Sequence, residues 1–392
     1  MIFRRHIHSP IGLDVGARTI KAVQLAHARR GWEVCAAAAF QRIAPGEEVN
    51  PAEIIRAVGV LRRQGFVGDQ AVVCIPSDKM LSAVIELPER TSGAPLDAIA
   101  RQELARSCKK DPGSIEIAWW ELPAPAFGPT GPGARPAHGT QALALGCAHA
   151  DANALLACFE PSGLDVIAID ARPAAVARAC AALAADAPNL TAILSLGHDA
   201  AHILILVGRT LVYERTLPEA SLRLLASGVA NQLSVSESLA EHVLRTIGCR
   251  PAEPSANSAP SDQAEIEALG AEARALVCAH ADALAAELKT SLSYAARRFD
   301  GEVMRILLSG VGADIPGIGD RIAQRAGIPE GEARIARADA LTPARPDTDP
   351  ALLGPGAALA LGLALHGASE SSTNPHRSRA AAPVAGAKEV AA

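Results

Sequence analysis

Aromatic residues and an excess of basic charge are both lacking in this sequence. Phe, Trp and Tyr make up only 3% of its 392 residues, although 49% of the residues are hydrophobic. The core must therefore be built from Ala, Leu, Ile and Val, a composition that suits layers of helices on sheets. The formal net charge of -5 provides no basic field for phosphate backbones and excludes nucleic acid as a principal partner. A chain of this length should form two or more domains.

Paired cysteines and membrane-length apolar runs are also missing. The eight cysteines include no C-x-x-C pair and no cluster with histidine at metal-ligand spacing, which predicts reduced thiols in a cytoplasmic protein. The longest apolar stretch, from Leu352 to Gly367, contains Gly and Pro and is shorter than the ~20 residues that cross a bilayer. The first residues, MIFRRHIHSP, contain no run typical of a signal peptide. We expect a soluble protein with no direct membrane insertion.

The first half of the sequence alternates short apolar runs with helical periodicity, which predicts a mixed α/β domain. Strands are expected at residues 11–13, 19–25, 70–75, 81–87, 115–122, 141–147 and 166–169. Helices that begin at Pro or at a capping Asp are expected at residues 51–64, 95–107, 151–159 and 173–185. The stretch 123–140 is rich in Pro and Gly, which predicts a long surface loop.

A second set of elements begins at Thr191. Strands are expected at residues 192–196, 201–207, 210–214 and 303–308, and helices at 219–231, 236–247 and 265–299. Residues 249–264 have the composition of a linker. After Ser369 the chain consists largely of small and polar residues with little to bury, so we expect a disordered tail over 369–392.

The two halves begin with similar sequences. IGLDVGARTIKAVQL, which starts at Ile11, aligns with AILSLGHDAAHILIL, which starts at Ala192, at a constant offset of 181 residues. Gly16 meets Gly197, and the apolar residues after each turn fall into step. A repeat at this long spacing predicts two like-folded domains that face each other rather than a solenoid.

A strand that stops at an aspartate, turns at a glycine and starts again can direct backbone N–H groups at one point. Such a turn is suited to phosphate, and two facing turns would hold a polyphosphate from both sides. Asp14 could hold water on a magnesium ion, and Lys21 could neutralise charge. An ordinary β-hairpin with Asp and Gly in its turn explains the first copy alone about equally well.

At these residues the chain resembles the actin-like ATPase superfamily, and within it the PilM family of type IV pilus assembly proteins, which is related to FtsA. The resemblance covers about residues 10 to 366. Three further stretches, 72–89, 159–179 and 284–299, resemble PilM more than other actin-like proteins. The nucleotide-binding residues that the resemblance implies are Asp14, Gly16, Ala17, Arg18, Thr19 and Lys21 in the first hairpin, Gly197, His198 and Asp199 in the second, and Gly310, Val311 and Gly312 in the adenosine motif.

The resemblance implies an actin-like, ribonuclease H-like α/β fold with ATP and Mg²⁺ in the cleft between two domains, Asp14 being the metal residue. The first domain would span 1–190, with an FtsA-type inserted subdomain at about 79–165. The second would span 191–353, with a helical subdomain at about 218–300. Residues 354–368 would return to the first domain.

The resemblance also implies a partner. PilM-like proteins lie at the cytoplasmic face of the inner membrane and capture the N-terminal peptide of the bitopic protein PilN. We therefore expect a PilN-like partner, with other pilus-platform proteins and self-association left open. The tail after Ser369 has neither the apolar face of an FtsA-type membrane helix nor the length of a transmembrane segment. Membrane attachment should then be indirect, through the partner.

Two positions depart from the superfamily pattern. The second hairpin begins with Ser195 where an aspartate is usual, and serine cannot supply the charge that orients a metal-bound water. Val311 replaces the middle glycine of the adenosine motif, and a β-branched residue neither lets a ligand approach closely nor adopts positive φ easily. These departures predict weakened nucleotide binding, at most a weak ATPase, and no catalytic residue.

Several other polar residues are interpreted as structural. The side chains of His198 and Asp199 should point apart, because they are adjacent in a turn. His202 begins a strand. Three residues near the expected adenine position fit a solvated helix face: Glu287, Lys289 and Ser291.

Two functions follow from this reading. One is a pilus-assembly adaptor with a degenerate ATP-binding cleft, and the other is an active ATPase or a sugar-kinase-like phosphotransferase of the same superfamily. A kinase of this superfamily needs a carboxylate base near the transferred phosphate, and Ser195 occupies the expected position.

Overall fold

The computed structural model describes residues 7–29, 31–46, 48–124, 139–250, 260–329 and 331–367. For residues 260–269 only the backbone is described. The predicted disordered tail 369–392 lies outside the described residues, as do most of the predicted loop 123–140 and residues 251–259 of the predicted linker.

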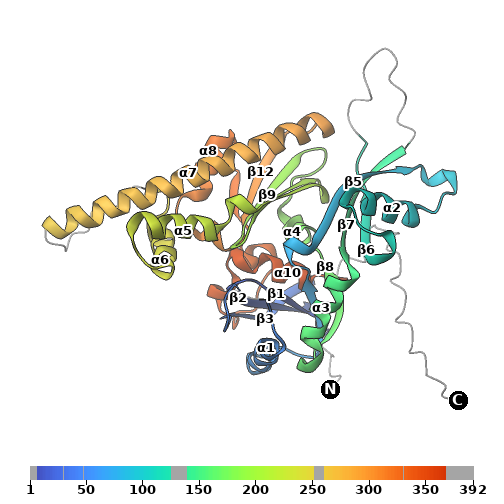
Figure 1. Cartoon of the computed structure of the whole chain (residues 1–392), viewed down its shortest axis with the longest axis horizontal. Coiled ribbons are helices and arrows are strands. Elements are labelled where there is room, and N and C mark those ends of the chain that lie inside the picture. Colours follow the sequence, from blue (N-terminus) through green and yellow to red (C-terminus); the bar gives the residue numbers. More distant parts are fainter. Residues whose placement is uncertain are drawn as a thin grey trace, which may run out of the picture.

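Two five-stranded sheets with the same strand order form the centre of the molecule (Figure 1). The first runs β3 (Gly31–Gln41), β2 (Thr19–Ala28), β1 (Ile11–Val15), β4 (Gln70–Cys74), β8 (Asp165–Asp170). The second runs β11 (Thr210–Leu217), β10 (Ala201–Val207), β9 (Leu190–Leu196), β12 (Val303–Ser309), β13 (Ala333–Ile335). In each sheet three antiparallel strands are followed by two parallel ones.

The two hairpins that open the sheets match residue by residue at the offset of 181. In β1 and β2, Asp14 pairs with Lys21, and in β9 and β10 the equivalent pair is Ser195 with His202. Each turn is closed by the N–H of its glycine, which donates to the carbonyl oxygen three residues later at 3.0 Å in the first copy and 3.1 Å in the second. The internal repeat is therefore a repeat of backbone structure as well as of sequence.

Helices cover the first sheet on both faces. Helix α1 (Pro51–Arg63) begins at Asn50, whose side chain accepts the N–H of Glu53, and its apolar side packs under the sheet. Helices α4 (Arg172–Cys180) and α10 (Ala358–Ala364) cover the other face, where one apolar cluster continues into the second sheet. This shared core joins the two halves below the cleft.

Helix α10 lies unusually close to its neighbours because two glycines remove side chains from the contact. A Cβ at Gly12 of β1 would lie 2.0 Å from the carbonyl oxygen of Ala360. A Cβ at Gly362 would lie 1.9 Å from the carbonyl oxygen of Ala175 in α4. Helix α10 therefore packs against the first sheet and α4, with backbone in contact with backbone.

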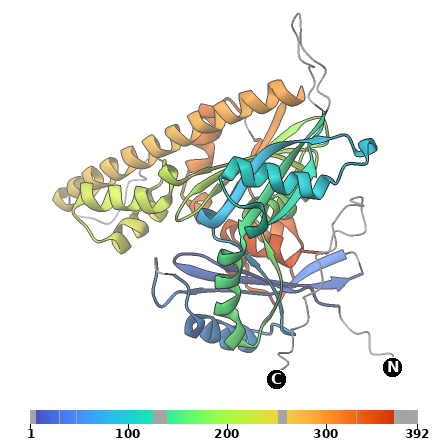
Figure 2. The same ribbon diagram turned by 45° about the vertical axis from the view of Figure 1, so that its right-hand side comes forward.

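A third, three-stranded sheet lies between β4 and β8 in the sequence (Figure 2). Its order is β5 (Met80–Pro88), β7 (Gly139–Ala148), β6 (Ile115–Glu121), and helix α2 (Leu96–Cys108) packs on it. It has its own small core, which includes Leu104 and Ile115. The following helix, α3 (His149–Phe159), belongs to a different layer, because its last residue is buried in the core of the first sheet.

The second sheet carries a helical layer that includes the longest helix of the chain, which crosses the top of the molecule in Figures 1 and 2. The helices of this half are α5 (Leu222–Leu233), α6 (Glu237–Ile247), α7 (Pro260–Phe299), α8 (Ile318–Ala326) and α9 (Ala338–Leu341). Helices α5 and α6 begin at Ser221 and Ser236, whose hydroxyls accept N–H groups of the first turn.

Some elements were not predicted, and several boundaries were wrong, such as the end of the helix predicted at 173–185, which stops at Cys180. Strand β3 was missed because its alanine run, residues 36–39, shows no clear period of two. Helix α7 begins at Pro260, so the last five residues of the predicted linker 249–264 are helical. Within the described ranges, no helix combines the length and apolar character needed to cross a bilayer.

The eight cysteines are all free, as predicted. Cys180 is buried and the other seven are half-buried. Burial raises the pKa of the Cys74 and Cys180 thiols to about 12, so both remain protonated and unreactive at neutral pH.

Candidate nucleotide-binding cleft

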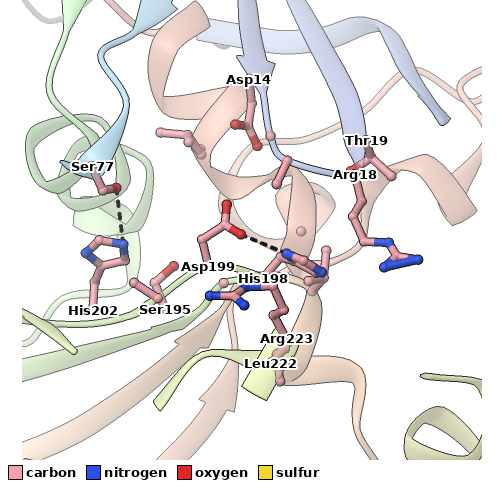
Figure 3. A pocket seen from close by; sticks show the side chains of 18 of the residues that line it. Asp14, Arg18, Thr19, Ser77, Ser195, His198, Asp199, His202, Leu222 and Arg223 are labelled. Carbon is pink, nitrogen blue, oxygen red and sulfur yellow. Dashed lines mark hydrogen bonds and ion pairs between the residues drawn. The ribbon is translucent and has the colours of Figure 1, made fainter. Parts of the chain in front are cut away.

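Both glycine hairpins line a single cavity of about 740 Å³ between the two sheets. Every residue of the predicted nucleotide site lines it except Gly312. Figure 3 shows the side chains of Asp14 and Asp199 directed into this space from opposite hairpins. The structure therefore brings together residues that lie about half the chain apart in the sequence.

The turns offer backbone N–H groups to the cavity, though not from the glycines themselves. The N–H of Gly16 and that of Gly197 close their own turns and cannot also serve a ligand well. In the part of the chain that the structure describes, the N–H groups that follow each glycine have no backbone acceptor, namely those of Ala17, Arg18, His198 and Asp199. Free N–H groups in successive residues of a turn are the usual cradle for an anion.

Asp14 has a free acceptor at the floor of the cavity. Its side chain lies 3.7 Å from Lys21 Nζ through Oδ2 and 3.8 Å from Arg172 Nη2 through Oδ1. Although the residue is only 5% exposed, Oδ1 has no hydrogen-bond partner among the described residues. A buried carboxylate oxygen with an unused lone pair fits a water on a divalent cation, and the nearby cations fit phosphate oxygens.

The described residues contain no group of three or more His, Cys, Asp or Glu side chains placed to hold a metal ion. This is compatible with magnesium, which usually keeps several waters and binds through one or two carboxylates together with the phosphates of a nucleotide. Asp14 is the carboxylate of the first hairpin that could take this role.

The prediction that His198 and Asp199 point apart was wrong. His198 Nδ1 and Asp199 Oδ1 lie 2.9 Å apart in a hydrogen bond. This bond lowers the pKa of the Asp199 carboxyl. The other ring nitrogen, Nε2, is buried without a hydrogen-bond partner and lies 3.9 Å from Glu241 Oε1. A second polar atom in the cavity wall is therefore unsatisfied.

Ser195 lies in the cavity wall where the superfamily pattern has aspartate, and no carboxylate replaces it in the β9–β10 pair. Its cross-strand partner His202 was interpreted as structural, but its ring also lines the cavity. Burial lowers the pKa of His202 to about 3, so the ring is neutral at pH 7. The charged pair of the first half, Asp14 with Lys21, is thus replaced in the second half by an uncharged pair, Ser195 with His202.

The adenosine motif differs from the prediction in one respect. The positive φ, +81°, belongs to Gly310, and Val311 begins a short 3₁₀ helix with ordinary backbone angles. Val311 therefore needs no strained conformation, and its effect is steric, because its side chain lines the cavity near Gly356. Gly312 serves packing, since a Cβ there would lie 2.8 Å from that of Leu196.

Sequence reasoning missed several polar residues that line the cavity, among them Ser77, Arg172, Arg223 and Glu241. Glu241 of α6 accepts Arg18 of the first hairpin at 2.8 Å, so an ion pair crosses the mouth of the cleft. No local motif marks these positions, although Ser77 and Arg172 belong to stretches that resemble PilM. By contrast, Glu287 pairs with Arg215 at 2.8 Å and lies outside the cavity, as do Lys289 and Ser291.

No protein-family model and no curated protein matches this sequence. Solved structures do match. A chain of the PilM–PilN type IV pilus biogenesis complex superposes with a TM-score of 0.70 at 18% identity, over 92% of this chain and 99% of that one. The ethanolamine utilization protein EutJ from Carboxydothermus hydrogenoformans gives 0.51 at 14% identity, over 92% and 90%. A diol dehydratase-reactivating factor in nucleotide-free form gives 0.52 at 10% identity, over 93% and 100%.

These likenesses extend over almost the whole of each chain, and the first is the strongest of the three. Together with the two sheets of identical order and the facing hairpins, they confirm the predicted fold class and the resemblance at the level of fold. The chain has the actin-like fold, shared with the matched chain of the PilM–PilN complex.

Proposed function

We propose that this chain is an adaptor of type IV pilus assembly whose cleft binds ATP with Mg²⁺ as a structural or switching ligand. The observation that carries the proposal is the match to a chain of the PilM–PilN complex over nearly the full length of both. The partner would be the N-terminal cytoplasmic peptide of a PilN-like inner-membrane protein. The chain would then act at the cytoplasmic face of that membrane through its partner.

The nucleotide would lie between the two hairpins. The free N–H groups of both turns would bind phosphate oxygens, and Lys21 and Arg172 would neutralise their charge. Asp14 would hold the magnesium ion through water, and Gly310 and Val311 would lie on the adenosine side. The two unsatisfied atoms, Asp14 Oδ1 and His198 Nε2, support a polar ligand in this space.

Hydrolysis should be slow. A water that attacks a phosphate needs a group that orients it and accepts its proton, and Ser195 has no charge to offer. The side chain of Val311 also takes up space in the cleft. Nucleotide that prefers one closure of the two halves would change partner affinity through the population of that state rather than through turnover.

The peptide groove would lie between the first domain and the three-stranded sheet that is inserted into it. β5, the edge strand of the inserted sheet predicted at about 79–165, carries the exposed side chain of Val84, and β8, the edge strand of the first sheet, carries that of Ile167. In this proposal both side chains would contact apolar residues of the peptide.

The test is a calorimetric titration of the full chain with MgATP, with and without a peptide from the N-terminus of a PilN-like protein. We expect peptide binding, nucleotide binding that Asp14→Ala weakens at least tenfold, and little phosphate release. Asp69→Ala, an exposed aspartate outside the cavity, is the matched control. A folded chain that binds no such peptide contradicts the adaptor role.

Phosphate release distinguishes the alternative function. Ser195→Asp restores the carboxylate of the superfamily pattern and should raise the rate of ATP hydrolysis if nucleotide binds as proposed. Rapid release by the unaltered chain, abolished by Asp14→Ala, would instead identify an active ATPase or phosphotransferase.

A further inference from the structure

A serine and a histidine from opposite halves of the molecule meet in the wall of the cleft. Ser77 begins the turn after β4, and His202 lies in β10 of the second sheet. Ser77 Oγ is 3.5 Å from His202 Nε2, as Figure 3 shows. The other ring nitrogen, Nδ1, is 3.2 Å from Thr216 Oγ1. Arg172 donates from Nε to Ser77 Oγ at 3.2 Å.

One arrangement of the protons gives every one of these groups a partner. A guanidinium can only donate, so Ser77 Oγ accepts from Arg172, and in the His202 tautomer with an unprotonated Nε2 it donates its own hydrogen to that nitrogen. The histidine proton then lies on Nδ1 and is donated to the Thr216 hydroxyl. Burial keeps this ring neutral, as its lowered pKa indicates. Ser77 therefore presents a hydroxyl whose proton already points at a free nitrogen lone pair.

The hydroxyl is also near the place where phosphates would lie. Ser77 lines the same cavity as the two hairpins. Arg172 lies between Ser77 and the carboxylate of the first hairpin, because its Nη2 is 3.8 Å from Asp14 Oδ1 while its Nε reaches Ser77. A guanidinium in this position can hold a phosphate oxygen against the serine and stabilise charge as a phosphoryl group moves.

We propose that the chain phosphorylates its own Ser77 with a nucleoside triphosphate bound in the cleft, an inference that depends on the nucleotide-binding part of the proposed function. Ser77 Oγ forms a bond to the γ-phosphorus, and the bond from that phosphorus to the β–γ bridging oxygen breaks. The proton of the hydroxyl passes to His202 Nε2, and the nucleoside diphosphate leaves with the electron pair of the broken bond.

Because position 195 carries serine in place of the usual aspartate, the Ser77 hydroxyl becomes more important as the acceptor of the phosphoryl group. Water has no carboxylate at position 195 to orient it, whereas the Ser77 hydroxyl is held by two partners. Phosphoryl transfer passes through a loose transition state, so a positioned hydroxyl needs only a weak base. A phosphate on Ser77 would remove the hydroxyl hydrogen that bonds to His202 of the other half and would place negative charge beside Arg172.

In the test, the purified full chain is incubated with MgATP that carries a labelled γ-phosphate, and the labelled residue is identified by peptide mass spectrometry. We expect one phosphate per chain, on the peptide that contains Ser77, at a rate per chain that does not depend on protein concentration. Ser77→Ala should abolish the label. His202→Gln keeps hydrogen-bonding groups but no basic nitrogen, and should slow labelling about 100-fold while calorimetry reports unchanged MgATP affinity.

Ser92→Ala, an exposed serine in the inserted subdomain, is the matched control and should label at the normal rate. Label on exposed serines such as Ser92, with none on Ser77, would overturn the proposal and identify a contaminating kinase. Nucleotide binding without label on Ser77 would overturn it while leaving the proposed cleft intact. Absence of nucleotide binding would reject both.

Discussion

His202 should make the chain sensitive to mild acid, and the size of the effect follows from its burial. In the folded chain burial lowers the pKa of this ring from 6.5 to about 3. The unfolded chain therefore takes up a proton near pH 6.5 that the folded chain refuses until about pH 3. Stability falls as the pH falls through this window.

Between pH 7 and pH 5 the loss of free energy of unfolding from this one residue is about 2 kcal/mol. The figure depends on the unfolded pKa alone, as long as the folded pKa lies well below 5. The replacement His202→Gln removes the titrating group and can still bond to Ser77 and Thr216. The free energy of unfolding of the variant should therefore fall by about 2 kcal/mol less than that of the unaltered chain between pH 7 and pH 5.

The assay is urea unfolding, followed by circular dichroism, of both proteins at pH 7 and pH 5. Other groups change stability with the opposite sign, such as Glu214, whose pKa is raised by burial. They are present in both proteins, so the difference between the two pH dependences isolates His202. Equal losses in the two proteins would mean that the ring is protonated or solvated in the folded state, and the base assigned to Ser77 would fail with it.

Three further predictions concern other parts of the molecule. The pKa of Asp170 is lowered to about 2, because its bonds to His366 and Arg178 outweigh the effect of burial. Between pH 4 and pH 2 the free energy of unfolding should therefore fall by about 2 kcal/mol more in the unaltered chain than in Asp170→Asn, as measured by urea unfolding. Gly362→Ala should destabilise by about 3 kcal/mol, since its methyl group would meet a backbone carbonyl of α4. Gly228→Ala in α5, where the space is open, should be neutral or stabilising in the same assay. Glu241→Gln should tighten ATP binding several-fold in calorimetry, because it removes a carboxylate that competes with phosphate for Arg18; weaker binding would refute this.

The fold could be predicted because the repeat carries it. Gly16 and Gly197 occupy equivalent turns, and the residues around them fall into one register, so aligning the two sequences also aligned the two sheets. The elements missed were those without a periodic signal. The alanine run of β3 fits helix and strand alike, and β13 has only three residues.

The site could be predicted only where it is local in sequence. The hairpin residues were found because strand, turn and strand are consecutive. Ser77 and Arg172 were missed because they lie 95 residues apart in the sequence and meet only in the folded chain. Hydrogen bonding between His198 and Asp199 was also misjudged, because side-chain directions in a turn depend on what surrounds it, here Glu241 of a distant helix.

The close packing of α10 against β1 and α4 limits how the two halves can move. The backbone of α10 contacts that of β1 at Gly12 and that of α4 at Gly362. These three elements should therefore move together as one rigid body. Because these elements cannot slide past one another, the cleft can open and close only by rotation of the two halves. The short segment before α10 links this rigid body to the second half, because the carbonyl of Pro355 accepts the N–H of Gly310. A ligand that contacts Gly310 would therefore act directly on this link, and its binding and release would change the angle between the two halves.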